Sequence, residues 1–519
     1  MLLITVLAIL SAATGAVALA SSTGTLNAPP AVTDQEQGMV SGAPFQDPPD
    51  AVMAAGAGGG LTVTLDAHDT QFDLGGKTAD GQSYNGFYVA PTISFNPGAT
   101  LDVRLVNHLP VATNLHFHGL HIDPMSHSDD DFLCVAPGDT YTYHLVIPAD
   151  HPPGTYWYHS HAMGTTCPGG VTGPINGTAT GTGTGTGMSM TGDVENQIFA
   201  GLSGALIVGD DRTLLPAAYQ HVIAHTFVLK DVQINASGTI AQNTASSKID
   251  SNAPTIRLIN GQLRPIVGMR PNETQLWRLI NAGADIFYRL RLDGYKFTVV
   301  GEDGVPVAGI TTVDTLLLPP AKRYDVLVTA NSTPGDSWLR TTAYSNGPQG
   351  DQYPDTALAQ LDVYGTAVNR LPALTGGVKT APASLADAKI AQQRTVDLSE
   401  SPDGLSFFIN GKQFDPTTSV FPDPAKLGTV EEWTILNESG EDHPFHLHTS
   451  TFQEMSVNGT AVPYTHMQDV VPVPHAVGGV PGKVVIRIPI EDYPGRWMFH
   501  CHIGAHEDNG MMSFLNVVS

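Results

Sequence analysis

Basic residues are scarce in this chain. Lys and Arg together number 24 against 49 Asp and Glu, so the formal net charge at pH 7 is -25. A surface of this sign repels phosphate backbones, which argues against a nucleic-acid partner, and it attracts cations. Charged residues make up only 14% of the sequence and long helical patterns are missing, whereas Gly (54) and Pro (38) are frequent. This balance predicts an all-β protein with many turns.

Long apolar runs are also missing after residue 20. The N-terminal run ends in Ala18-Leu19-Ala20 and predicts a signal peptide cleaved after Ala20, hence an exported protein that is secreted, periplasmic or held at the cell surface. No Lys or Arg precedes the run and it is long enough to span a bilayer, so an uncleaved membrane anchor is the alternative. Residues 21–60, rich in Ala, Gly, Pro and Ser, predict a flexible tether, so residues 1–60 lie outside any domain.

The rest of the chain repeats one pattern three times. In each copy an alternating strand runs through an Asn-containing turn into a second alternating strand, and a strand, a Pro/Gly turn and an aromatic strand follow downstream. The first halves are LDVRLVNHLPVATNLHFHGLHI (101–122), QLWRLINAGADIFYRLRLDGY (275–295) and EEWTILNESGEDHPFHLHTSTF (431–452), and the second halves lie at 141–161, 323–344 and 484–502. We therefore predict three consecutive β-domains of about 150 residues each, at 61–212, 213–370 and 385–519.

Histidine pairs occur in the first and third copies and not in the middle one. Alternate residues of a strand point to the same face, so each His-x-His pair presents two imidazoles to one side. A single pair is commonly two satisfied histidines on a half-buried strand, but four pairs in matching places of two repeats indicate a cluster of metal ions, for which copper, zinc, iron and nickel are all suitable. The pairs are His116/His118, His159/His161, His446/His448 and His500/His502. The first and third domains are thus predicted to share a metal site, with the middle domain as a spacer.

Cysteine is rare, with three residues in 519, and one of the three lies between two histidines. In the strand WMFHCH, Cys501 faces away from His500 and His502, so its thiolate serves a second metal centre beside the cluster. A cysteine, two histidines and a weak axial methionine form a blue-copper electron-transfer site. Zinc would require tetrahedral closure and would leave the adjoining cluster unexplained. The candidate ligands of the second centre are His443, Cys501, His506 and Met511.

The motifs HFHG, HSH, HPFHLH and HCHIGAHEDNGMM resemble the four copper-binding motifs of the multicopper oxidases, in particular their laccase-like three-domain members. The resemblance covers about residues 60–519 and implies three consecutive cupredoxin-like domains, each a Greek-key β-sandwich, with four copper ions per chain. By motif position it assigns the type 1 copper to His443, Cys501, His506 and Met511. It assigns the type 2 copper to His116 and His446, and the type 3 pair to His118, His159, His161, His448, His500 and His502.

The resemblance also implies the reaction. A reducing substrate gives electrons one at a time to the type 1 copper, the electrons pass through Cys501 to His500 and His502, and dioxygen is reduced to two waters at the trinuclear cluster. We expect a phenol or an aromatic amine as the donor and a monomeric enzyme. An oxidase of Cu(I) or Mn(II) that detoxifies the metal is a second interpretation, which the acidic surface favours. A copper nitrite reductase, or a non-catalytic copper store or electron carrier, is more remote, because neither accounts for four paired histidine motifs.

Carboxylates near the motifs are candidates for proton supply. Glu507, directly after His506, matches an acid that bacterial members of the resembled family place near the cluster, and an ordinary solvated carboxylate is the alternative. A second acid is expected after HFHG, where Asp129 or Asp130 fits. Asp469, in HMQDVV, resembles a buried acid that orients a copper ligand by hydrogen bonding.

The stretch after the second histidine pair departs from the resembled family. A Gly/Thr-rich insertion at 163–197 predicts a mobile surface loop. Its methionines form a candidate Cu(I) subsite, since thioethers favour Cu(I): Met163, Met188 and Met190. Cys134 and Cys167 predict a disulfide that anchors the start of the insertion, with two free buried thiols as the alternative.

Overall fold

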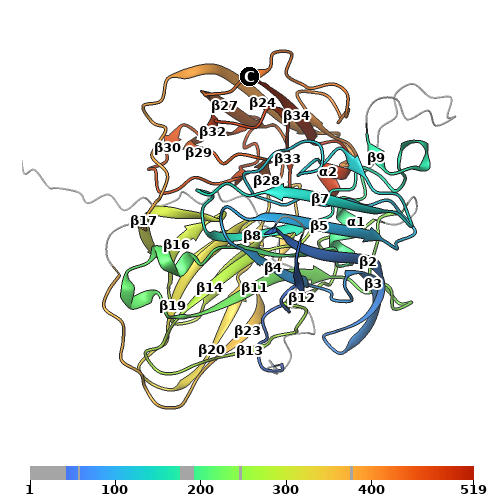
Figure 1. Ribbon diagram of the computed structural model, residues 1–519. Helices are drawn as coiled ribbons and strands as arrows, with labels where there is room; N and C mark the ends of the chain where they lie inside the picture. Colours follow the sequence, from blue (N-terminus) through green and yellow to red (C-terminus); the bar gives the residue numbers. More distant parts are fainter. Residues whose placement is uncertain (1–41, 57–58, 176–191, 245–247, 375–377) are drawn as a thin grey trace, which may run out of the picture.

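The computed structural model describes residues 42–56, 59–175, 192–244, 248–374 and 378–519. Within them the chain forms three β-domains, each built around two sheets (Figure 1). The first domain is drawn in blue and teal, the middle one in green and yellow, and the third in orange and red. The prediction of an all-β protein with three cupredoxin-like domains is confirmed. No helix among the described residues has both the length and the apolar character needed to cross a membrane.

The first domain combines a five-stranded and a three-stranded sheet. Their strand orders are β1-β2-β5-β7, with β3 paired to β2, and β4-β10-β8, and β6 pairs with β9. The elements are β1 (Met53–Ala55), β2 (Leu61–Leu74), β3 (Lys77–Tyr84), β4 (Ala90–Phe95), β5 (Thr100–Asn107), β6 (Leu133–Cys134), β7 (Thr140–Val146), β8 (Gly154–His159), η3 (Pro168–Gly170), β9 (Gly173–Pro174), α1 (Val194–Ala200) and β10 (Ser203–Val208). Two 3-10 helices, η4 (Asp211–Leu214) and η5 (Ala217–Tyr219), lead into the middle domain.

The middle domain has a six-stranded and a five-stranded sheet. The strand orders are β12-β11-β14-β19-β16-β17 and β13-β23-β20-β15-β18, with a separate pair β21-β22. The strands are β11 (Ile223–Val232), β12 (Ile256–Ile259), β13 (Ile266–Met269), β14 (Thr274–Asn281), β15 (Tyr288–Leu292), β16 (Phe297–Glu302), β17 (Val305–Val313), β18 (Thr315–Leu318), β19 (Arg323–Thr329), β20 (Gly335–Thr341), β21 (Tyr344–Ser345), β22 (Gln352–Tyr353) and β23 (Thr356–Val363).

The third domain repeats the strand order of the middle one. Its sheets are β25-β24-β27-β32-β29-β30 and β26-β34-β33-β28-β31, so β28 and β33 correspond to β15 and β20. The elements are β24 (Ile390–Glu400), β25 (Phe407–Ile409), β26 (Ala425–Lys426), β27 (Thr429–Asn437), β28 (His443–Leu447), β29 (Gln453–Val457), β30 (Thr460–Ala461), β31 (Val470–Val473), β32 (Gly482–Ile490), β33 (Gly495–Cys501), α2 (Gly504–Asp508) and β34 (Met512–Val518).

An asparagine at the equivalent position of each domain forms the same hydrogen bonds. Asn107, Asn281 and Asn437 end β5, β14 and β27, and all three are fully buried. Each side-chain amide donates to two backbone carbonyls at 2.7–3.1 Å, which satisfies polar groups that the turn would otherwise leave unpaired. The acceptors are Val111 and Val135, Ile286 and Leu318, and Glu441 and Val473. The repeated asparagine therefore ties the end of one sheet to the strand that follows.

Residues 42–56 of the predicted tether lie along two domains. The Phe45 amide donates to the carbonyl of Ile266 in β13 at 2.8 Å, and Asp47 accepts hydrogen bonds from the His225 ring (2.8 Å) and from the Thr226 amide (2.6 Å). Farther along, β1 pairs antiparallel with β2 of the first domain. The described part of the segment thus joins the edges of the first and middle domains, because its backbone groups pair with theirs.

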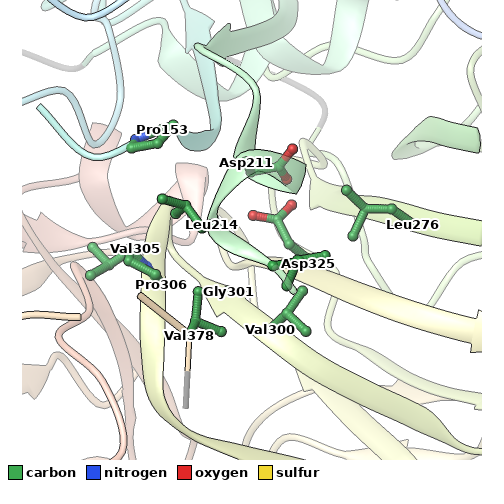
Figure 2. A pocket seen from close by; sticks show the side chains of 11 residues that line it. Pro153, Asp211, Leu214, Leu276, Val300, Gly301, Val305, Pro306, Asp325 and Val378 are labelled. Atoms are coloured by element: carbon green, nitrogen blue, oxygen red, sulfur yellow. The ribbon is translucent and has the colours of Figure 1, made fainter. Parts of the chain in front are cut away.

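A small, mostly apolar cavity lies where the first domain meets the middle one, and two carboxyl groups line it. Asp211, in the connecting segment, and Asp325, in β19, face each other across it, with Pro153 on the opposite wall (Figure 2). Its volume is about 10 Å³, room for about one water molecule. Asp211 forms an ion pair with Arg278 at 2.5 Å, and Asp325 accepts a hydrogen bond from Thr155 in β8. Specific polar contacts therefore fix the middle domain against the first.

The disulfide prediction is confirmed, since Cys134 and Cys167 are bonded and link β6 to the segment after the second histidine pair. Met163 is buried in an apolar cluster with both cysteines and with Met498 and Phe514 of the third domain. Its side chain is therefore packed as core, which corrects its assignment to a surface Cu(I) subsite. Met188 and Met190, the other members of that predicted subsite, lie outside the described residues.

Candidate metal centre

Three predicted type 1 ligands converge on one point in the third domain. His443 begins β28, Cys501 ends β33, and His506 lies in α2. Cys501 Sγ is 3.5 Å from His443 Nδ1 and 3.6 Å from His506 Nδ1, and the two Nδ1 atoms are 3.2 Å apart. A point equidistant from the three atoms lies about 2 Å from each, the distance expected between a metal ion and an imidazole nitrogen. The geometry fits one small metal ion.

The outer nitrogens of both type 1 histidines are held by oxygen atoms. His443 Nε2 is 2.7 Å from Ser439 Oγ, and His506 Nε2 is 3.1 Å from Glu441 Oε1. Phe407 stacks on the His506 ring with centroids 4.0 Å apart. Burial lowers the pKa of His443 to about 3 and that of His506 to about 4, so both rings are neutral and free to bind a metal.

The backbone of Met511 lies beside that of Cys501, and the axial role of its thioether stays a prediction. Both residues are fully buried. The Cys501 amide donates to the Met511 carbonyl at 3.1 Å, and the Met511 amide donates to the backbone carbonyl of His506 at 2.9 Å. Burial raises the pKa of the Cys501 thiol well above its ordinary value. A thiolate at this position therefore requires a bound cation, which is the coupling of deprotonation to metal binding that copper sites use.

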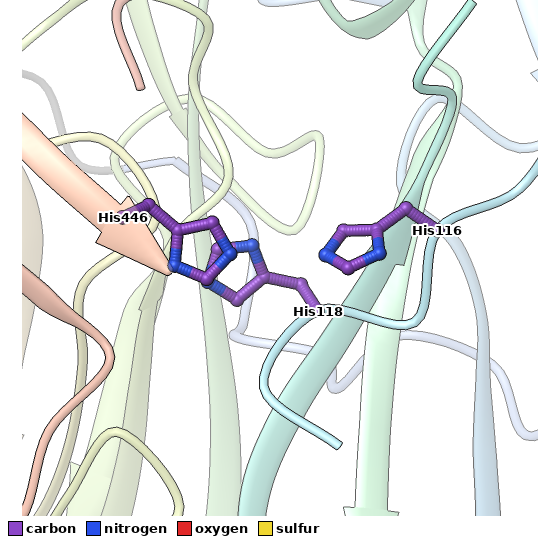
Figure 3. A group of neighbouring side chains, drawn as sticks. All are labelled: His116, His118 and His446. Atoms are coloured by element: carbon purple, nitrogen blue, oxygen red, sulfur yellow. The ribbon is translucent and has the colours of Figure 1, made fainter. Parts of the chain in front are cut away.

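The eight histidines of the four pairs lie together between the first and third domains. His116 stacks on His448, and His118 stacks on His446, with ring centroids 3.9 Å apart in each case. Figure 3 shows the stacked rings of His118 and His446, with the His116 ring close by. The ligand atoms form three groups, each within 4.8 Å, and the first two share His118: His116, His118 and His446; His118, His159 and His502; and His161, His448 and His500.

Matching strand pairs in the two domains present these rings. His116 lies opposite His159 in the first domain, and the amide of each donates to the carbonyl of the other at 2.9 and 3.1 Å. In the third domain His446 of β28 lies opposite His500 of β33. The alternation that the sequence predicts thus holds in both, and domain packing brings the two faces together.

The hydrogen-bond partners of the buried ring nitrogens show whether a metal ion fits the cluster. Nδ1 of His116, His159 and His446 is engaged by an oxygen atom, whereas the other ring nitrogen has no hydrogen-bond partner. Such orphaned polar atoms are costly to bury unless a ligand satisfies them. The nitrogens without any partner are Nε2 of His116, His159, His446 and His502 and Nδ1 of His118 and His161. Imidazole groups arranged in this way fit copper ions.

Most cluster imidazoles are held in the neutral, metal-binding form. Burial lowers the pKa of His118, His159, His446 and His448 well below the ordinary value. His116 differs: burial also lowers its pKa, but the carboxylates of Asp129 and Asp131 outweigh burial and raise the pKa to about 10. A cation on the His116 ring would replace that proton, so metal binding and proton release are linked there.

The run Asp129–Asp131 contributes two buried acids, and one of them was not predicted. Asp129 Oδ1 lies 3.2 Å from His116 Nδ1 and accepts from the Phe117 amide at 2.9 Å. Asp131 reaches His116 Nδ1 at 3.3 Å and His448 Nδ1 at 2.8 Å. Asp130, predicted as the alternative to Asp129, accepts from the Phe132 amide at 3.1 Å, and no contact of the described residues joins its carboxylate to either ring. Asp129–Asp131 lie in an irregular segment, where neighbouring side chains point in different directions. The sequence has no periodicity there from which these directions could be predicted.

Glu507 and Asp469 both lie where the sequence places them, against cluster histidines. Glu507 is fully buried, with Oε1 3.1 Å from His161 Nε2 and Oε2 3.0 Å from His500 Nδ1. The alternative of a solvated carboxylate is therefore wrong. Asp469 Oδ1 lies 3.3 Å from His118 Nε2, and the Asp469 carbonyl accepts from His446 Nδ1 at 2.8 Å.

A cleft leads from the surface to the residues beside the cluster. It has a volume of about 270 Å³, enough for several water molecules. Gly119 and Thr449, which follow His118 and His448 in the chain, line it together with Tyr156 of the first domain. The cleft thus reaches the backbone beside two cluster histidines, and no residue of the type 1 group lines it.

Comparison with known proteins gives one consistent family. Models described as multicopper oxidase match residues 66–177, 224–366 and 385–519, one match in each domain. Multicopper oxidase MmcO of Mycobacterium tuberculosis is 25% identical over 512 residues, which cover 90% of this chain and 90% of that protein. The laccase of Bacillus subtilis is 26% identical over 508 residues, which cover 84% of this chain and 89% of that protein.

A solved structure agrees with these relatives. A multicopper oxidase from Campylobacter jejuni, described as a metallo-oxidase, is similar in fold with a TM-score of 0.72 and 25% sequence identity. The similarity covers 92% of this chain and 96% of that one. Both the histidine motifs and the three-domain fold therefore point to the same chemistry.

Proposed function

The chain belongs to the multicopper oxidase family and carries out copper-dependent oxidation with O2 as acceptor, and on this premise we propose that its donors are small phenols or aromatic amines. When bound, copper supplies one-electron oxidation at the group of His443, Cys501 and His506 and the reduction of O2 at the histidine cluster. We assign four ions to each chain, one to the type 1 group and three to the eight clustered histidines.

The contact between Glu441 and His506 carries the proposal for the donor. Their side chains keep 10% and 8% of their area exposed, whereas His443 and Cys501 are fully buried. A donor therefore approaches the type 1 group at the His506 edge. A phenol or arylamine releases a proton as it loses an electron, and the Glu441 carboxylate is placed to accept a hydrogen bond from that group.

A second candidate, oxidation of Mn(II) or Cu(I), is favoured by the other carboxyl groups at this edge. Glu400 and Asp351 lie close enough to interact electrostatically with both Glu441 and His506. Asp442 accepts hydrogen bonds from Tyr344 at 2.8 Å and pairs with His475 at 2.7 Å. Carboxylate oxygens suit Mn(II), whereas Cu(I) prefers sulfur ligands, so within this alternative the edge favours Mn(II).

The chain's own acids have distinct proposed tasks at the histidine cluster. Asp129 and Asp131 bind Nδ1 of His116 and His448, which fixes the tautomer that leaves Nε2 for the metal. Glu507 bridges His161 and His500 with no exposed area, and we assign it the delivery of protons to reduced oxygen.

Oxygen uptake by the copper-loaded protein tests the donor. A methoxyphenol, Cu(I) and Mn(II) are compared as electron sources for the parent chain and for Glu441→Gln. We expect the fastest uptake with the methoxyphenol, without accumulation of peroxide, and a loss of about 10²-fold in kcat/KM for this donor in the variant. Glu438→Gln removes an equal charge from an exposed position nearby and should leave kcat/KM unchanged. Faster uptake with either metal ion would replace the phenol proposal by the metal-oxidase candidate.

We also propose that the protein is exported with its signal peptide cleaved after Ala20, and that it acts as a monomer. The disulfide between Cys134 and Cys167 supports an oxidising compartment. N-terminal sequencing of the mature protein should begin at Ser21, whereas an intact N-terminus in a membrane fraction would favour the anchor. Light scattering of the purified protein measures the oligomeric state.

A further inference from the structure

Arg323 is fully buried at the start of β19, in the domain that has no metal-binding motif. Its guanidinium donates to both carboxylate oxygens of Asp469, in the third domain, at 2.6 Å each. It also donates to the backbone carbonyl of Thr155, in the first domain, at 3.4 Å, and to that of Ala321 at 3.2 Å. One side chain of the middle domain thus contacts both of the domains that share the histidine cluster.

Asp469, the partner of Arg323 in this bidentate ion pair, contacts two imidazole rings of the cluster. Its carboxylate lies 3.3 Å from His118 Nε2, and its carbonyl accepts from His446 Nδ1 at 2.8 Å. The remaining nitrogens, His118 Nδ1 and His446 Nε2, are the orphaned atoms of this ring pair. The two rings stack at 3.9 Å, so a shift of Asp469 would displace both potential ligands together.

The backbone around this pair is shaped to admit Arg323. Gly119, directly after His118, has φ of +84°, and a Cβ there would collide with the Arg323 guanidinium and lie 2.7 Å from Asp469 Oδ2. On the other side Asp303 accepts from the backbone amides of Arg323 (3.1 Å) and Asp469 (3.2 Å). The glycine of HFHG is therefore required by the close approach of a side chain from another domain.

We propose that Arg323 is a positioning residue of the trinuclear copper site, which clamps Asp469 and so fixes the His118 and His446 imidazoles. A bidentate arginine sets the orientation of a carboxylate, which a point charge such as lysine does not. The middle domain then takes part in copper binding without providing a ligand. The inference rests on the copper centre of the proposed function and is independent of the electron donor.

Copper binding by Arg323→Lys and Arg323→Met in the full chain tests this role. After copper loading, we expect a weaker type 2 EPR signal and weaker near-ultraviolet absorption of the type 3 pair, while the blue type 1 absorption is kept. A chelator should remove the cluster copper about 10–100-fold more readily, as is typical when a residue that orients a metal ligand is lost. Lys should cause the smaller change, because it still offers one charged hydrogen bond to Asp469.

Arg394 provides a matched control. It is buried in the third domain and makes a similar bidentate pair with Glu431, at 2.7 and 2.9 Å, and among the contacts of the described residues neither touches a cluster histidine. Arg394→Lys and Arg394→Met should lower the thermal unfolding temperature and leave all copper signals intact. Equal copper signals and equal chelator resistance in the Arg323 and Arg394 variants would show that Arg323 only joins domains.

A second variant keeps the test decisive if Arg323→Met does not fold. Asp469→Asn preserves the size of the side chain and weakens both the clamp and the contact with His118. The same loss of type 2 and type 3 signals is expected, with the type 1 absorption kept. Wild-type copper stoichiometry and chelator resistance in Asp469→Asn would overturn the proposal, whether or not the protein oxidises any donor.

Discussion

The middle and third domains share one strand order but differ in the use of one sheet face. In the third domain every residue of β28 is buried, and His446 of this strand lies opposite His500 of β33. In the middle domain β15 alternates buried and exposed residues, with Arg289 and Arg291 on the exposed face. The same strand framework therefore carries a metal site in the third domain, where the first domain covers the sheet. In the middle domain, where this face is open, it carries exposed arginines.

Burial is what distinguishes these two faces chemically. Imidazoles in the covered face lose protons because burial lowers the pKa of residues such as His446 and His502. On the open face Arg291 forms an exposed ion pair with Asp293 at 2.8 Å. A neutral, desolvated nitrogen without a hydrogen-bond partner gains from a metal ion, whereas a hydrated one gains little. The metal-binding character of this face therefore depends more on its burial by the first domain than on the strand framework.

The largest effect is expected from removing the Cys501 thiolate of the third domain, for which the middle domain has no counterpart. Cys501→Ser should abolish the blue colour and all measurable substrate oxidation, because the type 1 group loses its strongest copper ligand. The coppers of the histidine cluster should remain bound. Absorption spectra, copper analysis and oxygen uptake measure the three outcomes. Oxidation of any donor at the parent rate would mean that electrons enter elsewhere.

Glu507→Gln should have the next largest effect. The amide keeps the shape of the side chain between His161 and His500 but cannot deliver a proton, so we expect turnover to fall about 10²-fold. Copper content and the blue absorption should stay unchanged, which separates proton supply from assembly of the site. Steady-state oxygen uptake with a saturating donor measures the change. A parent-like turnover number would refute the assignment of Glu507.

The repeated asparagines offer a direct test of the domain comparison. Asn281→Ala removes three buried hydrogen bonds and Asn437→Ala removes four. Each substitution should lower the unfolding free energy by about 1–3 kcal/mol. Only Asn437→Ala should also alter the blue absorption, because Asn437 accepts from Ser439, whose hydroxyl lies 2.7 Å from His443 Nε2. Denaturant unfolding and absorption spectra measure the two effects. An altered spectrum in Asn281→Ala would contradict the separation of the domains.

The smallest effect is expected on the open face of the middle domain. Arg291→Gln removes an exposed ion pair with Asp293, which should change the unfolding free energy by less than about 1 kcal/mol. Copper content and oxygen uptake should not change, since no metal-holding group among the described residues lies on this face. A loss of copper in this variant would mean that the two faces are not as different as their burial indicates.

Several features of the site could be predicted because they depend on local sequence. Strand alternation places His500 and His502 on one side and Cys501 on the other, and the structure keeps that arrangement. Glu507 could be named because its place directly after His506 matches an acid of the resembled family. Asp131 could not be distinguished from Asp130, because both lie in an irregular segment where no period relates sequence to direction.

The sequence by itself determined the repeated β-framework, the histidine pairs and the faces on which they lie, since these follow from spacing along single strands. Only the tertiary structure decided that Asp131 and not Asp130 reaches the rings, that residues 42–56 pack along two domains, and that Arg323 grips Asp469. Each of these contacts joins segments far apart in the chain. Their formation depends on how whole domains pack, and nothing in the spacing of nearby residues encodes that packing.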